Sequence, residues 1–384
     1  MNINLNSILA TLESQLAAFD SSSSPVEIFK TLKAYHEAGG KTTAVYDSAG
    51  VIPIDADYVG SIVSTADGTL YTLDSAGGSW SNANIPGPEV IIPYIFGGTI
   101  SGYSAGGSTP TLVNTIQKFS FTTDGNSTDV GDLVYANQEA TGQSSSTDGY
   151  SSGGYAPAAA NYIQKFSFAT DGNATDVGDL VAVSTEANGH SSETDGYHSG
   201  GYSGPIVRTA IDTFPFASDG NATDAGDMFI STYNASSQTS PTHGYVSAGV
   251  SPSSPSPIMN TIHKFPFAVG VTGTDVGDAL RADFNTTGQS SETNGYISGG
   301  AFPAATNTIQ KFSFASDGNA TDVGDLINST NKHAGQSSET FGYTSGGTPV
   351  NNNVIQKFPF ASDGNATDVG DLLSVLVNAT GHQY

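Results

Sequence analysis

The sequence contains no cysteine, which excludes disulfides, thiol nucleophiles and zinc sites with thiolate ligands. Basic residues are also scarce, because 11 Lys and Arg stand against 36 Asp and Glu, for a net charge of -25. A chain this acidic repels a phosphate backbone, so we expect no nucleic-acid partner.

Long apolar segments are missing as well. Residues 1–20 lack the basic start and unbroken apolar core of a signal peptide. No stretch has the length of a membrane-spanning helix, so we expect synthesis in a cytoplasm and no membrane insertion. Glycine, in contrast, is abundant at 46 of 384 residues, which is typical of many short strands joined by turns.

Three motifs recur six times in a fixed order. The first contains Gly-Tyr and, two residues later, Gly-Gly (Ala-Gly in the fourth copy). Its tyrosines are Tyr103, Tyr150, Tyr197, Tyr245, Tyr296 and Tyr343, at steps of 47, 47, 48, 51 and 47 residues. A motif close to IQKFSF and then one close to DGNATDVGDL follow each of them. The chain therefore contains six tandem copies of one unit of about 47 residues.

Each unit is predicted to form four short strands, separated by Asp-Gly, Gly-Gly and Asp-Gly-Asn turns. The first strand surrounds TGQSS, the second is GYxSGG, the third is NTIQKFSF and the fourth follows VGDL. In the third strand Ile116 lies on one face while Phe119 and Phe121 lie on the other. Both faces are apolar, so each sheet must stack on its neighbours to cover them.

Two architectures satisfy this requirement, an open solenoid and a closed propeller. A unit of four strands and about 47 residues fits a propeller blade. The chain also ends as a next unit would begin, with NATGHQY from Asn378, and no polar cap follows. We therefore predict an all-β, six-bladed propeller over residues 90–384, with the chain end meeting its start near residues 90–96.

These motifs resemble the blade of kelch and galactose-oxidase-like proteins, in which a strand ending in Gly-Gly precedes a strand with an aromatic residue. The fourth-strand tryptophan of kelch is missing, since the only tryptophan is Trp80. The phrase NTIQKFSFASDGNATDVGDL, followed by AGQSS and GYTSGG, resembles repeats in structural proteins of tailed phages of marine bacteria. The resemblance covers residues 90–384 and implies a virion protein made in the host cytoplasm.

Residues 1–40 do not repeat and are predicted to be helical. Two helices are expected in this segment. The second begins at Ser24-Pro25 and stops at Gly39-Gly40. The apolar positions of the two helices include Leu5, Ile8, Leu9, Leu12, Leu16, Phe29 and Leu32. This stripe either packs within the amino-terminal part or serves for attachment to other virion proteins and for homo-oligomerisation in the particle.

Residues 41–89 are predicted to form a small β-hairpin module. One hairpin spans residues 42–54, and another spans residues 58–73 with its turn at Asp67-Gly68. The pattern VGSI…DGTLY…SW at residues 58–80 is similar to a small β module of phage virion proteins.

The loop DGNATDVGD is the richest candidate for an ion site. In the second copy it offers Asp171, Asn173, Asp176 and Asp179, and oxygen ligands at such spacing are typical of calcium loops. The full twelve-residue calcium loop is absent, and the fourth copy lacks the first Asp and the Asn. The alternative is that these side chains bond the turn backbone and that the last Asp pairs with a strand lysine such as Lys165.

No catalytic set is visible. The seven histidines take non-equivalent positions in the repeat or lie outside it, and the aspartates are spread evenly, whereas a glycan hydrolase or lyase needs carboxylates in one pocket. We therefore expect no enzymatic activity.

The connection between the second and third strands varies most among the copies. Loops carry recognition, so variation within a regular scaffold indicates partner binding, with tolerated drift as the alternative. The candidate contact residues are Tyr155, Pro157, Tyr202, Pro205, Pro252, Pro255 and Phe302. Exposed aromatic residues suit contact with host carbohydrate or protein. Our expectation is a tail fibre, tail appendage or capsid fibre, with a cellular adhesin or scaffold and a propeller glycan enzyme as alternatives.

Overall fold

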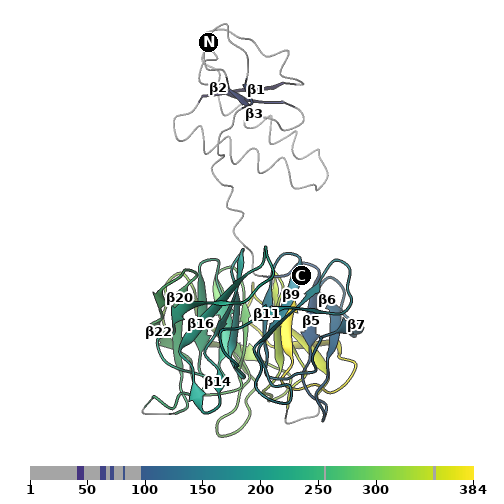
Figure 1. Cartoon of the computed structure of the whole chain (residues 1–384), viewed down its shortest axis with the longest axis vertical. Helices are drawn as coiled ribbons and strands as arrows, with labels where there is room; N and C mark the ends of the chain where they lie inside the picture. Colours follow the sequence, from purple (N-terminus) through teal and green to yellow (C-terminus); the bar gives the residue numbers. More distant parts are fainter. Residues whose placement is uncertain are drawn as a thin grey trace. The chain divides into compact units, whose positions relative to one another are not determined.

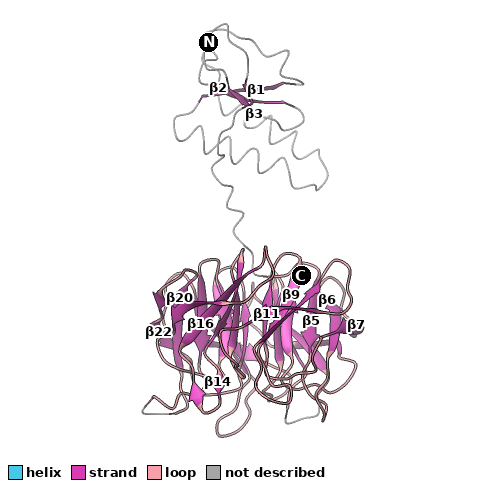
Figure 2. Cartoon of the chain, in the orientation of Figure 1, coloured by secondary structure: helices cyan, strands magenta, loops and turns pink. Residues whose placement is uncertain are grey.

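A computed structural model describes residues 97–254, 257–348 and 352–384 in full, and residues 41–46, 61–65, 70–72 and 81–82 as backbone strands. The chain divides into two compact units, residues 1–92 and residues 93–384. Figure 2 shows strands and loops in the described part of the chain. Within that part, no helix is long and apolar enough to cross a membrane.

The amino-terminal unit contains a four-stranded sheet in the order β1 (Lys41–Tyr46), β2 (Ser61–Thr65), β3 (Leu70–Thr72) and β4 (Ser81–Asn82). β2 and β3 pair antiparallel, while β1 pairs with β2 in parallel. The two predicted helices with all their apolar positions, from Leu5 to Leu32, lie outside the described residues, as does the second strand expected at residues 51–54.

The second unit is a six-bladed β-propeller, with the blades side by side around a ring (Figure 1). Blade 1 contains β31 (Thr380–Gln383), β5 (Ser101–Ala105), β6 (Thr115–Ser120) and β7 (Thr128–Asp132), from the axis outwards. Blade 2 contains β8 (Thr141–Ser144), β9 (Asp148–Ser152), β10 (Tyr162–Ser167) and β11 (Thr175–Asp179). Blade 3 contains β12 (Asn188–Ser191), β13 (Asp195–Ser199), β16 (Ala210–Pro215) and β17 (Thr223–Asp227).

Blade 4 contains β18 (Ser236–Thr239), β19 (His243–Ser247), β20 (Thr261–Pro266) and β22 (Thr274–Asp278). Blade 5 contains β23 (Thr287–Ser290), β24 (Asn294–Ser298), β25 (Thr308–Ser313) and β26 (Thr321–Asp325). Blade 6 contains β27 (Ala334–Ser337), β28 (Phe341–Ser345), β29 (Val354–Pro359) and β30 (Thr367–Asp371). The hairpin of β14 (Tyr202–Ser203) and β15 (Ile206–Val207) forms a separate two-stranded sheet in the connection between β13 and β16, and β21 (Val271–Thr272) pairs with β17.

The ring is closed by the last strand of the chain. β31 pairs antiparallel with β5, so that His382 lies opposite Tyr103. The prediction of a closed propeller is therefore confirmed, and the chain end pairs with residues 101–105, while residues 90–96, where the contact was expected, lie outside the described residues. The first repeat begins with its second strand, so the end of the chain has to supply the missing inner strand of that blade.

The fourth strand does not follow VGDL, as the sequence had indicated, but consists of the TDVGD segment itself, as in β7. This strand is the outermost of the four strands of each blade, and the loop of the next blade pairs with it. The amides of Gly172 and Ala174, for example, donate to the carbonyls of Val130 and Asp132 on β7, both at 2.7 Å. The apolar residues after it, which had indicated a strand, lie instead in the connection to the next blade.

The core lies between the blades, as the two apolar faces of the third strand required. The tyrosine of each Gly-Tyr motif stacks on a phenylalanine of the next blade, as Tyr150 does on Phe216 with ring centroids 4.9 Å apart. Ile163 of blade 2 packs in the same cluster, on Phe214 of blade 3. Since each blade covers its neighbour, no blade has a complete core of its own.

Candidate functional site

The antiparallel strand order gathers two kinds of connection at one end of the propeller. The connections between second and third strands meet those that lead from the fourth strand into the next blade. Isolated β-bridges join them, for example between Tyr155 and Gln138 and between Tyr202 and Thr185. We call this end the loop face; it carries β14, at the lower end of the propeller in Figure 1.

The structure places the predicted contact residues on the loop face. Tyr155, Tyr202 and Phe302 are 39%, 39% and 46% exposed, and Pro157, Pro205 and Pro252 are exposed as well. Pro255 lies outside the described residues. These side chains belong to the loops of four successive blades, and Tyr155 and Pro157 share one loop, as do Tyr202 and Pro205.

The centre of the loop face is a feature that the sequence analysis missed. Just before each inner strand, one residue adopts a left-handed backbone with φ between 54° and 60°. The six residues are Glu139, Glu186, Asn234, Asn285, Lys332 and Asn378, which we call the axial ring. The amide of each donates to the carbonyl of the preceding member, at 2.8–3.3 Å, so the hydrogen bonds form a closed circle. The backbone of this ring is therefore fixed by the closure of the propeller.

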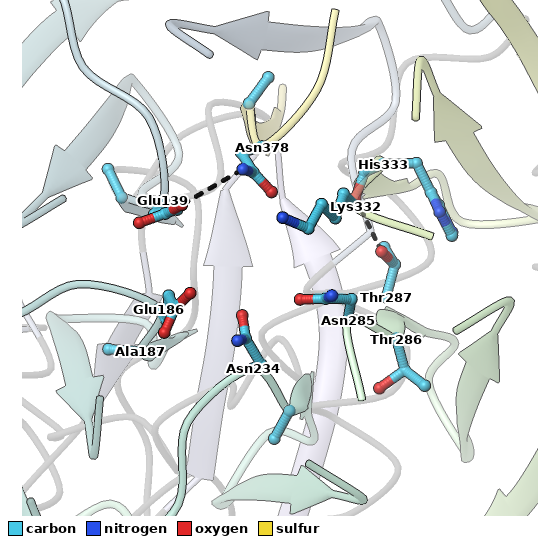
Figure 3. A pocket seen from close by; sticks show the side chains of 13 residues that line it. Glu139, Glu186, Ala187, Asn234, Asn285, Thr286, Thr287, Lys332, His333 and Asn378 are labelled. Carbon is cyan, nitrogen blue, oxygen red and sulfur yellow. Dashed lines mark hydrogen bonds between the residues drawn. The ribbon is translucent and has the colours of Figure 1, made fainter. Parts of the chain in front are cut away.

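The side chains of the axial ring surround the mouth of the central channel (Figure 3). The cavity at the mouth has a volume of about 110 Å³, and a second cavity of about 130 Å³ is lined by the inner strands. Asparagine in three of six copies was a signal for this position, because asparagine tolerates the left-handed conformation. Glutamate and lysine at the equivalent positions concealed the pattern.

Two carboxylates and one ammonium group set the electrostatics of the mouth. Burial raises the pKa of Glu139, the charge of Glu186 raises it further, and Lys332 lowers it. Nδ2 of Asn378 and Nε2 of Gln138 each lie 3.3 Å from Oε1 of Glu139, as hydrogen-bond donors. Among the eight basic side chains of the described propeller, seven pair with aspartate, and Lys332 forms no ion pair.

The connections of the loop face carry no net charge. Their acidic residues are Glu139, Glu186 and Asp283, and their basic residues are Arg208, Arg281 and Lys332, so three charges of each sign cancel. At the opposite end, the connections contain Glu193, Glu292, Glu339 and the five loop aspartates Asp124, Asp171, Asp219, Asp317 and Asp363, with no basic residue. The charges of the loop-face connections thus cancel, while an aspartate that ends each fourth strand, such as Asp132, adjoins them. At the opposite end, each of the five loop aspartates pairs with a strand lysine.

The loop face is also the apolar face. Fourteen large hydrophobic side chains are exposed among the described residues, and twelve of them belong to loop-face connections. Six occupy one equivalent position, two residues after the fourth strand, and are 44–56% exposed: Val134, Val181, Phe229, Leu280, Ile327 and Leu373. Ile100 and Val269 are the two exceptions. Exposed apolar surface of this extent is typical of an interaction site.

Two of the four residues of the calcium hypothesis, Asp171 and Asn173, lie in the opposite-face loop, and Asp176 and Asp179 belong to the fourth strand β11. The carboxylate of Asp171 accepts hydrogen bonds from Nζ of Lys118 in blade 1, at 3.0 and 3.2 Å. Oδ1 of Asn173 accepts one from the amide of Asp132, and Asp176 caps the amide of Gly178 at 3.4 Å. Asp179 ends β11. No cluster of three or more His, Asp or Glu suited to a metal ion occurs among the described residues.

Lysine pairs with aspartate across the blade boundaries. Lys165 pairs with Asp219, the first Asp of the loop in the next blade, and not with the last Asp of a loop as the sequence had indicated. Five of the six boundaries contain this pair. Between blades 3 and 4 both partners are replaced together, by Thr213 and Gly270.

The histidines are mostly structural. His190 and His382 occupy the same inner-strand position, which corrects the expectation of non-equivalent positions. Four blades have glutamine there, and Nε2 of Gln143, for example, donates to the carbonyl of Tyr197 in the next blade at 3.1 Å. Burial lowers the pKa of His190 to about 3 and that of His382 to about 4, so both are neutral.

No known protein family matches the chain, and no curated protein is similar to it. The architecture, six blades of four antiparallel strands, is consistent with the kelch-like repeat that the sequence resembles.

Proposed function

We propose that this chain is a non-enzymatic virion structural protein of a tailed phage, of the tail-fibre, appendage or capsid-fibre type. Its propeller presents the loop face to the host surface or to neighbouring virion proteins. Its amino-terminal segment attaches it to the particle, where it forms a homo-oligomer.

One observation carries the binding role. Twelve of the fourteen large hydrophobic side chains exposed among the described residues belong to the loop-face connections. Exposed apolar side chains gathered at one end of an acidic protein favour that end as the place where a partner binds. The virion context rests on the resemblance of the repeat phrases.

The binding role is tested by adsorption of the purified full-length chain to intact bacterial host cells. We expect the triple variant Tyr155→Ser, Tyr202→Ser and Phe302→Ser to adsorb at least tenfold less. Val269→Ser is the matched control, because it removes a 77% exposed side chain from the opposite face. Equal adsorption of the triple variant and the wild type would contradict the binding role.

The virion context needs a separate measurement. We expect the chain to copurify with intact tailed particles through a density gradient, at a fixed ratio to the capsid protein. A chain found only in the cell fraction would favour a cellular adhesin or scaffold.

Glycan hydrolysis is the second candidate, and the axial ring is the observation that favours it. Glu139 and Glu186 line one cavity, and the pKa of Glu139 is raised. Glycosidases use such a pair, in which the carboxyl with the raised pKa acts as the acid. New reducing ends from host polysaccharide, abolished by Glu139→Gln, would support this candidate over the binding role alone.

A further inference from the structure

We propose that the axial ring is a binding site for one unit of a neutral glycan, such as a terminal hexose. This inference rests on the proposed function, because it names the chemistry that the loop face recognises. The site consists of six side chains around one cavity, which no single repeat contains.

The hydrogen-bonding groups of the ring match hydroxyl groups. The side chains of Glu139 and Glu186 offer acceptors, Lys332 offers donors, and each of the three asparagines offers both. A hydroxyl group donates one hydrogen bond and accepts others, so a ring of mixed groups can satisfy several hydroxyls of one sugar. The backbone groups of the ring are already paired with each other, which leaves the side chains to contact the ligand.

The charges of the ring disfavour an anion and partly offset each other for a cation. The two carboxylates repel an anion, while the ammonium group of Lys332 opposes a cation. An uncharged polyol meets neither penalty. Because Lys332 has no carboxylate partner among the described residues, its hydrogen atoms remain available to hydroxyl oxygens.

Two exposed tyrosines pair, through their backbones, with the residues that precede the two glutamates. Tyr155 is bridged to Gln138, the residue before Glu139, and Tyr202 is bridged to Thr185, the residue before Glu186. A tyrosine ring has an apolar face and a polar hydroxyl tip, so it suits the apolar face and the hydroxyl groups of a sugar. The sector of blades 2 and 3 therefore combines acceptors with aromatic platforms, a combination absent from the other four blades.

The size of the cavity limits the ligand. A volume of about 110 Å³ holds roughly four water molecules, well below the roughly 300 Å³ of a drug-sized pocket. This is room for one end of a single sugar ring, with the rest of a glycan lying outwards across the loop face.

The test uses saturation-transfer NMR on the full-length chain with glucose, galactose, mannose, fucose, rhamnose and N-acetylglucosamine, each up to about 50 mM. The key variant is Glu139→Asn with Glu186→Asn, since asparagine already occupies three of the six equivalent positions at the same φ. We expect at least one sugar to bind and its affinity to fall at least tenfold in this double variant. The control, Glu193→Gln with Glu339→Gln, removes the same charge from the opposite face and should bind like the wild type.

Lys332→Asn distinguishes a neutral ligand from a cationic one. Loss of the ammonium group weakens the binding of a neutral sugar and strengthens the binding of an arginine-rich hexapeptide. Peptide binding that rises in Lys332→Asn and disappears in the double variant, without sugar binding, would overturn the proposal in favour of a basic protein partner.

Three further results overturn the proposal. They are the absence of saturation transfer from every sugar, sugar binding that is unchanged in the double variant, and release of new reducing ends from oligosaccharides. Loss of cell adsorption in the loop-face triple variant is measured independently. The adsorption experiment therefore tests the proposed function, and the sugar experiment tests the axial ring, independently of each other.

Discussion

The two faces of the propeller differ in how far their six copies agree. At the opposite face, five copies have the same Asp-Gly-Asn loop and the same lysine pair across the boundary. At the loop face, the connections between second and third strands range from 8 to 13 residues, and the axial ring contains three residue types. The difference indicates that one face maintains the ring while the other is free to fit a partner.

The boundary between blades 3 and 4 shows what the repeated face requires. It lacks both Lys and Asp of the pair, and Gly270 starts a loop whose β21 runs parallel to β17. Arg208 and Asp212 instead form a buried ion pair within blade 3, at 2.8 Å. Backbone pairing between neighbouring blades is therefore common to all boundaries, and the ion pair is added to it.

A substitution that separates the inner strands around the axis should have the largest effect on stability. A Cβ at Gly288 would lie 1.8 Å from the carbonyl oxygen of Ser237 in the neighbouring inner strand. Gly288→Ala is expected to lower the free energy of unfolding by about 3 kcal/mol or to prevent folding. Gly364→Ala, with open space around its Cβ, is the control. Urea unfolding measures both, and equal midpoints for the two variants would contradict the close approach of the inner strands.

Acid should be the next most damaging condition. The folded pKa of His382 is about 4, below the value of about 6.5 in an unfolded chain, so the stability present above pH 6.5 is lost as the pH falls towards 4. For one histidine the loss is at most about 3 kcal/mol. His190→Gln with His382→Gln restores the repeat and should move the acid-unfolding midpoint to lower pH. Circular dichroism against pH measures it, and an unchanged midpoint would refute the assignment.

Asp283 is a loop-face residue that should destabilise the protein. Its carboxylate is buried without a hydrogen bond, with Arg281 at 3.4 Å, and burial raises its pKa to about 6. The folded state therefore holds the proton more tightly than the unfolded state, and stability falls as the pH rises from about 4 to 6.

Asn137 occupies the equivalent place in another blade and donates to the carbonyl of Gly153 at 3.3 Å. Asp283→Asn should therefore stabilise the protein by about 2 kcal/mol at pH 7 and by little at pH 4. Thermal unfolding at the two pH values measures the difference. A variant that is less stable than the wild type at pH 7 would show that Arg281 compensates the buried charge.

Removing one of the Lys–Asp ion pairs between blades should have a small effect on stability. The Asp219 side chain is 55% exposed, so Lys165→Thr is expected to cost about 0.5 kcal/mol or less. The double variant Lys165→Thr with Asp219→Gly copies the boundary between blades 3 and 4 and should show that the two losses are not additive. Urea unfolding of the singles and the double gives the coupling.

Loop-face substitutions should have the smallest effect on stability. Phe302→Ser and Tyr155→Ser remove exposed side chains and should change the free energy of unfolding by no more than about 0.5 kcal/mol. The same variants should lose binding to the host cells. Substitutions at the opposite face, in contrast, should change stability and leave binding unchanged. A large loss of stability would show that these side chains support the fold.

The number of blades, the inner three strands of each blade and the closure of the ring could be predicted from the amino-acid sequence. These follow from local motifs, such as Gly-Tyr before Gly-Gly and the alternation of Ile163 and Phe166, and from the requirement that two apolar faces be covered. The same local logic failed at the fourth strand, because an acidic strand such as β11 has no apolar alternation to reveal it.

The axial ring and the partners of the lysines became visible in the three-dimensional structure alone. Glu139 and Asn378 are 239 residues apart, and their contact exists because the last strand completes the first blade. Lys165 likewise pairs with the loop of the next blade rather than with its own. The physical reason is closure: each group meets its partner only when six blades form a ring, and no single repeat contains both.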